Sequence, residues 1–212
     1  MQITWLGQSC FKIDTKSGND EVTIIIDPFD PEKTGLKLPR TLTADIVLQS
    51  DEKLAHPVET KEGKRPFVIG KPGEYEVKGV FVYAIPVIRE GSVAQHIFWI
   101  EAEQIVLTHL GSLDHIPDEK VTEHIENLDV LLLPVGGNGV LDVKQASELV
   151  SELEPRMVIP MQFNIPGLKL KRDEVGPFLK AVGAKSETMP KLKLTKKDLP
   201  ADEMKVVVLE KI

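Results

Sequence analysis

The segment 46–56 places the strongest constraint on what this chain can fold into. Residues 46–48 form an apolar run directly after Asp45, and such a run is typical of a short buried strand. The chain then becomes abruptly polar, with Asp, Glu, Lys and His side chains, until Pro57 ends the segment. Proteins of the α/β and αββα classes often build their sites in loops of this kind, so the pattern predicts a functional cleft here.

Length and charge exclude several classes of protein. A chain of 212 residues is long enough for one well-buried domain and short for two, so we expect a single domain over residues 1–212. The net charge of −7 and the pI near 5.3 argue against a nucleic-acid surface, which usually needs a basic face. They argue equally against an anionic membrane surface. We therefore expect neither nucleic acid nor a membrane as a partner.

The single cysteine, Cys10, excludes an internal disulfide and suits a reducing compartment. It lies in an alternating pattern without an evident basic neighbour, which predicts a buried structural thiol. No apolar run approaches the roughly twenty residues that a membrane-spanning helix needs, and no leader pattern is evident at the start. The sequence thus predicts a soluble, cytoplasmic protein.

Hydrophobic periodicity predicts many strands and few helices. Strands are expected at residues 3–6, 10–13, 22–26, 46–48, 67–69, 80–85, 96–100, 105–109, 129–134, 157–161 and 204–209. Helices are expected at residues 118–127, 143–153 and 173–182. Asp142, followed three residues later by Gln145, forms a capping-box pattern at the start of the second helix.

Three segments in order along the chain carry a resemblance to a known family. They are ITWLGQSCF at residues 3–11, IIIDPF at residues 24–29 and GEYEVKGV at residues 73–80. They resemble the metallo-β-lactamase superfamily, in particular its branch near L-ascorbate-6-phosphate lactonase. The resemblance implies an α/β fold, arranged as a four-layer αββα sandwich, and a zinc-dependent type of hydrolase that holds two zinc or manganese ions.

The family's main metal loop is altered in this chain. In that branch the strand at 46–48 is followed by Ser or Thr and then by His-x-His-x-Asp-His, which binds the metals. Aligned without gaps, Ser50 and His56 keep the family's residue types, whereas the other three ligand positions hold Asp51, Lys53 and Ala55. Neither an ammonium nor a methyl group offers a lone pair to a metal ion, and the Lys53 charge would repel one.

Two later ligand positions also differ from the family. Ser112 stands where the family has an Asp that bridges both metals, and Gln162 replaces the last His ligand. A neutral hydroxyl cannot balance and bridge two divalent cations as a carboxylate does. His109 and His115 flank Ser112 in a loop that should face the same cleft. By the same resemblance, Asp27 would brace the metal loop from behind.

The main expectation from these substitutions is a non-classical or catalytically inactive member, a pseudoenzyme with a degenerate metal site and no cofactor. It would bind a small molecule or a partner protein in the former active-site cleft, and self-association would suit such a scaffold. The candidate cleft residues are Asp51, Lys53, His56, His109, Ser112 and Gln162.

The alternative is a metal-dependent hydrolase of a small ester, lactone or phosphorylated substrate. A single zinc or manganese ion would be held by Asp51, His56 and His109, with His115 as a further ligand, and a metal-bound water would be the nucleophile. A metal-free version would use His56 or His109 as the general base beside Lys53. A nucleic-acid processing role is disfavoured by the acidic charge.

Overall fold

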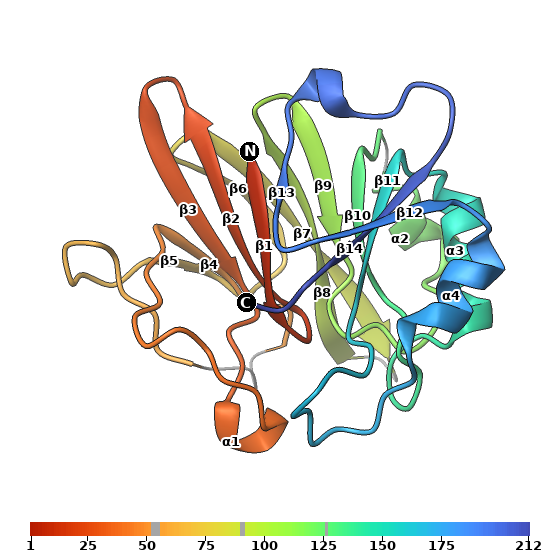
Figure 1. Cartoon of the computed structure of the whole chain (residues 1–212). Coiled ribbons are helices and arrows are strands. Elements are labelled where there is room, and N and C mark those ends of the chain that lie inside the picture. The colour runs from red at the N-terminus through yellow and green to blue at the C-terminus, as the bar shows by residue number, and fades with distance from the viewer. Residues whose placement is uncertain (52–55, 90–91, 126) are drawn as a thin grey trace.

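The computed structural model describes residues 1–51, 56–89, 92–125 and 127–212, which form two β-sheets that face each other (Figure 1). The first sheet contains β1 Gln2–Gly7, β2 Cys10–Ser17, β3 Asp20–Ile26, β4 Ile46–Leu48, β5 Phe67–Ile69 and β13 Leu192–Lys193. The second contains β6 Gly73–Val77, β7 Val80–Arg89, β8 Ser92–Ala102, β9 Ile105–His109, β10 Val130–Pro134, β11 Met157–Met161, β12 Lys185–Met189 and β14 Lys205–Leu209. The strand orders are β13-β1-β2-β3-β4-β5 and β12-β14-β11-β10-β9-β8-β7-β6.

Strand β3 shows why a continuous apolar run folds here. Successive side chains of a strand point to opposite faces of the sheet. Ile24 and Ile26 therefore join the main core between the sheets, whereas Ile25 joins a second cluster with Cys10 and Phe29 on the outer face. A β-branched run that is buried on both faces is typical of a central strand with a parallel neighbour, and β3 pairs in parallel with β4.

The outer layers differ between the two sheets. Helices α3 (Val143–Leu153) and α4 (Val175–Val182), with the short α2 (Glu119–Thr122), lie on the outer side of the second sheet (Figure 1). On the first sheet this place is taken by irregular chain that supplies Leu36, Leu42 and Val58 to the outer cluster, whereas the short α1 (Pro31–Thr34) lies at the lower end in Figure 1. The predicted α/β, αββα sandwich is confirmed.

Parallel pairing gathers several loops at one end of the sandwich. β3, β4 and β5 are parallel to one another, and so are β9, β10 and β11. The carboxyl ends of parallel strands meet at the same edge of a sheet, where α/β proteins bind their ligands. The segment after β11 returns to α1 at this end, the lower one in Figure 1, and Lys169 N donates to Thr34 O at 2.8 Å.

The sequence predictions hold for the buried strands and for β5 and α4, and they differ from the structure at α2, β6 and β12. The helix expected at 118–127 is limited to α2, because none of its side chains is buried. β12 and β6 were missed because their side chains are mostly exposed or only partly buried. The single-domain prediction stays a prediction, although the C-terminal strands β12, β13 and β14 enter both sheets. In the described part of the chain, no helix is long and apolar enough to cross a membrane.

Two of the aspartates that precede helices, Asp142 before α3 and Asp118 before α2, give a matched test of capping. Asp142 Oδ1 accepts a hydrogen bond from Gln145 N at 2.8 Å, and Gln145 Oε1 accepts one from Asp142 N at 3.0 Å. Asp118 stands before α2 and makes no such side-chain bond. We expect Asp142→Ala to lower the free energy of unfolding by about 1 kcal/mol, and Asp118→Ala to change it by less than about 0.5 kcal/mol. Urea unfolding measures both, and equal losses would contradict the capping role of Asp142.

Candidate active site

The site begins where β3 and β4 end side by side. Asp27 follows β3 with a left-handed backbone at φ 47°, and its amide donates to Leu48 O at 2.9 Å. Its carboxylate accepts two hydrogen bonds from Ser50, one from the amide at 2.7 Å and one from Oγ at 2.6 Å. Asp27 and Ser50 are both fully buried. The Asp27 carboxylate therefore holds the first residues of the polar loop after β4.

A second hydrogen-bonded set spans three elements of the other sheet. Gln95 of β8 accepts from Ser112 N at 2.8 Å through Oε1, and Gln162 Nε2 donates to Ser112 Oγ at 2.8 Å. Gln162 directly follows β11 and has a left-handed backbone at φ 56°. The two glutamines are buried, whereas Ser112 is partly exposed. Ser112 is thus fixed from both sides by amide groups.

Glycine at two positions allows these sets to lie close together. A Cβ at Gly111, whose φ is +60°, would lie 2.7 Å from Gln95 Oε1 and 3.0 Å from Ser50 Oγ. A Cβ at Gly136 would collide with the carbonyl oxygen of Gln162. The loop after β9 therefore packs directly against Ser50 and Gln95, and the loop after β10 packs against Gln162.

His109 lies at the end of β9 and is fully buried. Its Nε2 lies 2.9 Å from Ser9 O, so this nitrogen carries the hydrogen and donates it, because a carbonyl only accepts. Its Nδ1 accepts from Gly111 N at 3.1 Å. Burial lowers the pKa of His109, although the nearby Asp27 charge opposes this. Both ring nitrogens are thus engaged within the protein, and neither is left for a metal or a substrate.

The remaining residues of the expected cleft lie beside the polar loop. Asp51 and His56 are partly buried, and His56 N donates to Pro28 O at 3.0 Å. Lys53 lies outside the described residues. Among the residues that the structure describes, no three His, Cys, Asp or Glu side chains form a group that could hold a metal ion. The structure accordingly does not bring Asp51, His56 and His109 together as one ligand set.

The His115 ring is hydrogen-bonded to the carboxylate of the neighbouring Asp114. Its Nδ1 lies 2.6 Å from Asp114 Oδ1, in the loop that also carries Ser112. His115 and Asp114 are both partly exposed. A carboxylate at Nδ1 favours the form of the ring in which this nitrogen carries the hydrogen, so that Nε2 can accept a proton.

Sequence reasoning missed two glutamines of this end. Gln95 was covered by no motif, and Gln8 lies within the motif at residues 3–11 but was not singled out as a site residue. Gln8 has a left-handed backbone at φ 50°, is 4% exposed, and its side-chain amide has no partner among the described residues. Trp5 Nε1 donates to Gln8 O at 2.8 Å, and the Trp5 ring packs on Phe163 at 4.9 Å between centroids. A lone glutamine carries no sequence signal that could have identified either residue.

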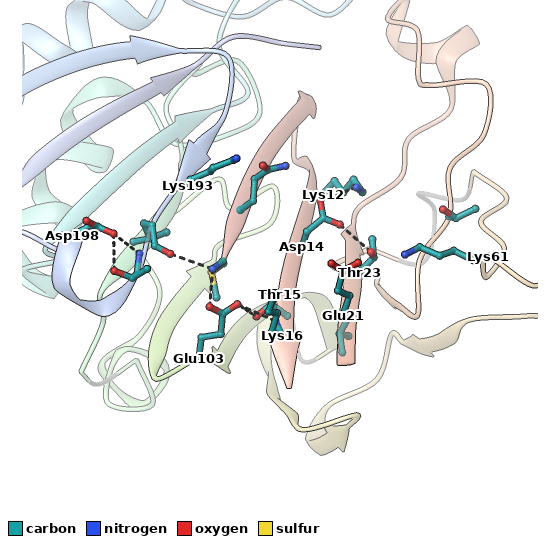
Figure 2. Close-up of a pocket in the computed structure, with 16 residues that line it drawn as sticks. Lys12, Asp14, Thr15, Lys16, Glu21, Thr23, Lys61, Glu103, Lys193 and Asp198 are labelled. Carbon is teal, nitrogen blue, oxygen red and sulfur yellow. Dashed lines mark hydrogen bonds and ion pairs between the residues drawn. The ribbon is translucent and has the colours of Figure 1, made fainter. Parts of the chain in front are cut away.

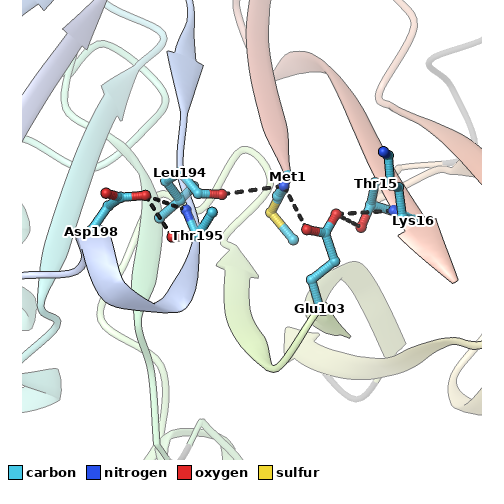
Figure 3. Close-up of polar contacts among 7 residues, drawn as sticks. All are labelled: Met1, Thr15, Lys16, Glu103, Leu194, Thr195 and Asp198. Carbon is cyan, nitrogen blue, oxygen red and sulfur yellow. Dashed lines mark hydrogen bonds and ion pairs between the residues drawn. The ribbon is translucent and has the colours of Figure 1, made fainter. Parts of the chain in front are cut away.

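A polar cavity of about 770 Å³ lies at the opposite end of the sandwich (Figure 2). Charged groups on its walls pair with one another and join separate strands. The Met1 amino group donates to Glu103 Oε2 at 2.8 Å, and Glu103 Oε1 accepts from Thr15 Oγ1 at 2.7 Å and from Lys16 N at 2.9 Å (Figure 3). These contacts hold strand ends in place, so we assign no chemistry to this cavity.

The buried His109 predicts a specific dependence of stability on pH. Its folded pKa is lowered, so the unfolded chain, with a histidine pKa of about 6.5, binds the proton more readily. The stability contribution is complete above about pH 6.5 and is lost as the pH falls below it. We expect the Tm of the parent to fall between pH 7 and pH 5, and to fall less in His109→Gln, whose amide can still donate to Ser9 O.

His56→Gln is the matched control, because His56 is only partly buried, and it should keep the pH dependence of the parent. Thermal unfolding at a series of pH values measures all three proteins. A His109→Gln variant with the full pH dependence of the parent would rule out His109 as the source.

Comparisons with known proteins agree with this fold. The family model described as a beta-lactamase superfamily domain matches residues 2–162. A UPF0173 protein of Pyrococcus abyssi is 30% identical, and the match covers 79% of this chain and 85% of the relative. A UPF0173 metal-dependent hydrolase of Methanosarcina mazei is 25% identical, and the match covers 89% of this chain and 93% of the relative.

A crystal structure from Thermotoga maritima is similar over nearly its whole length. It covers 98% of this chain and 97% of the other, with 33% identity and a TM-score of 0.80. That protein is described as a candidate zinc-dependent hydrolase of the metallo-β-lactamase superfamily.

These names correct two expectations from the sequence. The main expectation of a pseudoenzyme is contradicted, because relatives are named metal-dependent hydrolases. The expectation of no cofactor is contradicted by the same names, which are consistent with zinc or manganese. The substitutions at the ligand positions had been given more weight than the family as a whole supports. With its family match over residues 2–162, this chain belongs to the metallo-β-lactamase superfamily and, within it, to the UPF0173 proteins.

Proposed function

We propose that this protein is a hydrolase that cleaves a small ester, lactone or phosphorylated substrate at the carboxyl ends of β4, β9 and β11. The observation that carries the proposal is the set of Gln95, Ser112 and Gln162, which converges by hydrogen bonds at that end. Two of these residues stand at positions where the family resemblance places metal ligands. The names of the relatives support hydrolysis as the class of reaction.

Ser112 provides a donor that Gln162 holds in place. Ser112 Oγ accepts from Gln162 Nε2, so the serine hydroxyl hydrogen remains to be donated to a substrate oxygen. Gln162 Oε1 is buried and has no partner among the described residues, so the partly exposed Ser112 is the member of the pair that can meet a substrate. A donor that is held in place before the reaction stabilises charge on a carbonyl or phosphoryl oxygen as that charge develops.

His115 is the residue we assign as general base. Asp114 orients the ring through Nδ1, so Nε2 takes a proton from the attacking water. This is the arrangement of a carboxylate, a histidine and a nucleophile that hydrolases on several folds use. His109 does not serve this purpose, because both of its ring nitrogens are bonded within the protein.

The names of the relatives imply a metal cofactor, and one of them names zinc. The described donors do not fit a pair of ions, because Ser112 and Gln162 are neutral and the His109 ring is fully engaged. We therefore derive no catalytic step through a metal, and measurement decides whether the reaction depends on one.

Two finer assignments belong to the same proposal. A lactone or a phosphorylated molecule is the preferred substrate, on the resemblance of the motifs at residues 3–11 and 24–29 to the L-ascorbate-6-phosphate lactonase branch. A cytoplasmic location is supported by Cys10, the chain's single cysteine, which is buried as a free thiol.

The test is a hydrolase assay on untagged protein with esters, lactones, phosphomonoesters and phosphodiesters, preceded by elemental analysis. We expect Ser112→Ala and His115→Gln each to lower kcat/KM by about 100-fold, since each removes a group that acts on the transition state. Ser151→Ala is the control, because this exposed serine of α3 bonds only within its helix, to Ser147 O at 3.1 Å.

Metal dependence is measured in the same assay by chelation, followed by return of zinc or manganese. Thermal unfolding of each variant shows that its fold is kept. Absence of turnover of every substrate class, both with and without added metal, would contradict the proposed hydrolase.

A further inference from the structure

A groove of about 550 Å³ lies over β6, β7 and β8 and shares no lining residue with the candidate active site. Its walls include Tyr75, Phe81, Tyr83 and Trp99. The rings of Phe81, Tyr83 and Trp99 gather in this one place, whereas Tyr75 borders it from β6, where it stands opposite the inward-pointing Val82. Phe81 is 48% exposed, and with its two neighbours it forms an apolar patch of the kind that marks ligand-binding grooves.

The register of the strands places the rings of Phe81, Tyr83 and Trp99 on one face. Val82 of β7 is 2% exposed in the core, so its neighbours Phe81 and Tyr83 point to the outer face of the sheet. Tyr83 stands directly opposite Trp99 of β8. The His124 ring, just after α2, meets the Tyr83 ring edge-on at 5.4 Å between centroids. The groove is therefore built from cross-strand neighbours and closed on one side by the segment after α2.

Three glutamates border the aromatic walls. Glu74 stands opposite Tyr83 across β6 and β7, Glu101 stands opposite Phe81 across β7 and β8, and Glu123 follows α2. Among the residues that the structure describes, no lysine or arginine lines the groove. Within the described residues none of the three glutamates forms an ion pair. Carboxylates beside the electron-rich faces of aromatic rings give a negative potential, which attracts a cation.

We infer that this groove binds a small organic cation of the quaternary ammonium type. Aromatic faces attract a weakly hydrated cation and also contact its methyl groups, whereas a bare metal ion would need several oxygen ligands close together. The volume lies within the range of small-molecule sites, about 300–1,000 Å³. A neutral ligand would gain no charge–charge attraction from Glu74, Glu101 and Glu123, so the charge of the groove favours the cation.

Choline and 3,3-dimethyl-1-butanol are the probes, because the second has the same shape without the charge. The indole N–H resonances of the two tryptophans report binding by NMR. Trp99 lines the groove, whereas Trp5 is 1% exposed in the core and serves as an internal control. We expect choline to shift the Trp99 resonance saturably and to bind about tenfold more tightly than the neutral isostere, within the range of measured cation–π contributions.

Substitutions separate the charge from the rings. Glu101→Gln and Tyr83→Leu should each weaken choline binding by about threefold or more, whereas Glu148→Gln, an exposed change on α3, should leave it unchanged. Thermal unfolding confirms that each variant is folded. Equal affinities for choline and 3,3-dimethyl-1-butanol, no shift at Trp99, or full choline affinity in Glu101→Gln would each overturn the inference.

Discussion

The rest of the site depends on the Asp27 carboxylate. Asp27 has a left-handed backbone conformation, which costs about 1–3 kcal/mol in a residue other than glycine. Burial of its charged carboxylate away from water costs more. Two hydrogen bonds from Ser50 offset this cost. Ser50 O in turn accepts from His96 N of β8 at 2.9 Å. One carboxylate therefore fixes the end of β4 and aligns it with the second sheet.

Next to this anchor, the set of Gln95, Ser112 and Gln162 is built from neutral groups. Directional hydrogen bonds join Gln95, Ser112 and Gln162. Amides and hydroxyls interact through the geometry of donor and acceptor rather than through net charge. Such a set can position a substrate oxygen or a water without depending on pH, but it cannot balance two divalent ions. Membership of the superfamily supports the class of reaction, and these side chains determine how this chain can take part in it.

The sequence predicts the parallel strands well and the site only in part. β3, β10 and β11 are apolar runs because they are buried on both faces, and a run of this kind is visible without coordinates. His109 shows the limit, since its position suggested a ligand or a base. The partner of its Nε2 is Ser9 O, 100 residues away in the chain. Contacts of that kind are set by the tertiary fold and leave no local pattern.

The aromatic groove is open because α2 is shorter than the helix that the sequence predicts at 118–127. A helix over the whole of 118–127 would extend further along the outer face of β7, with which α2 is in contact. The helix instead ends at Thr122, and none of its side chains is buried against the sheet. The outer rows of β7 and β8 therefore keep Phe81, Tyr83 and Trp99 as the walls of an open groove. Aromatic rings in outward strand positions would be a liability on an uncovered sheet, unless a ligand covers them.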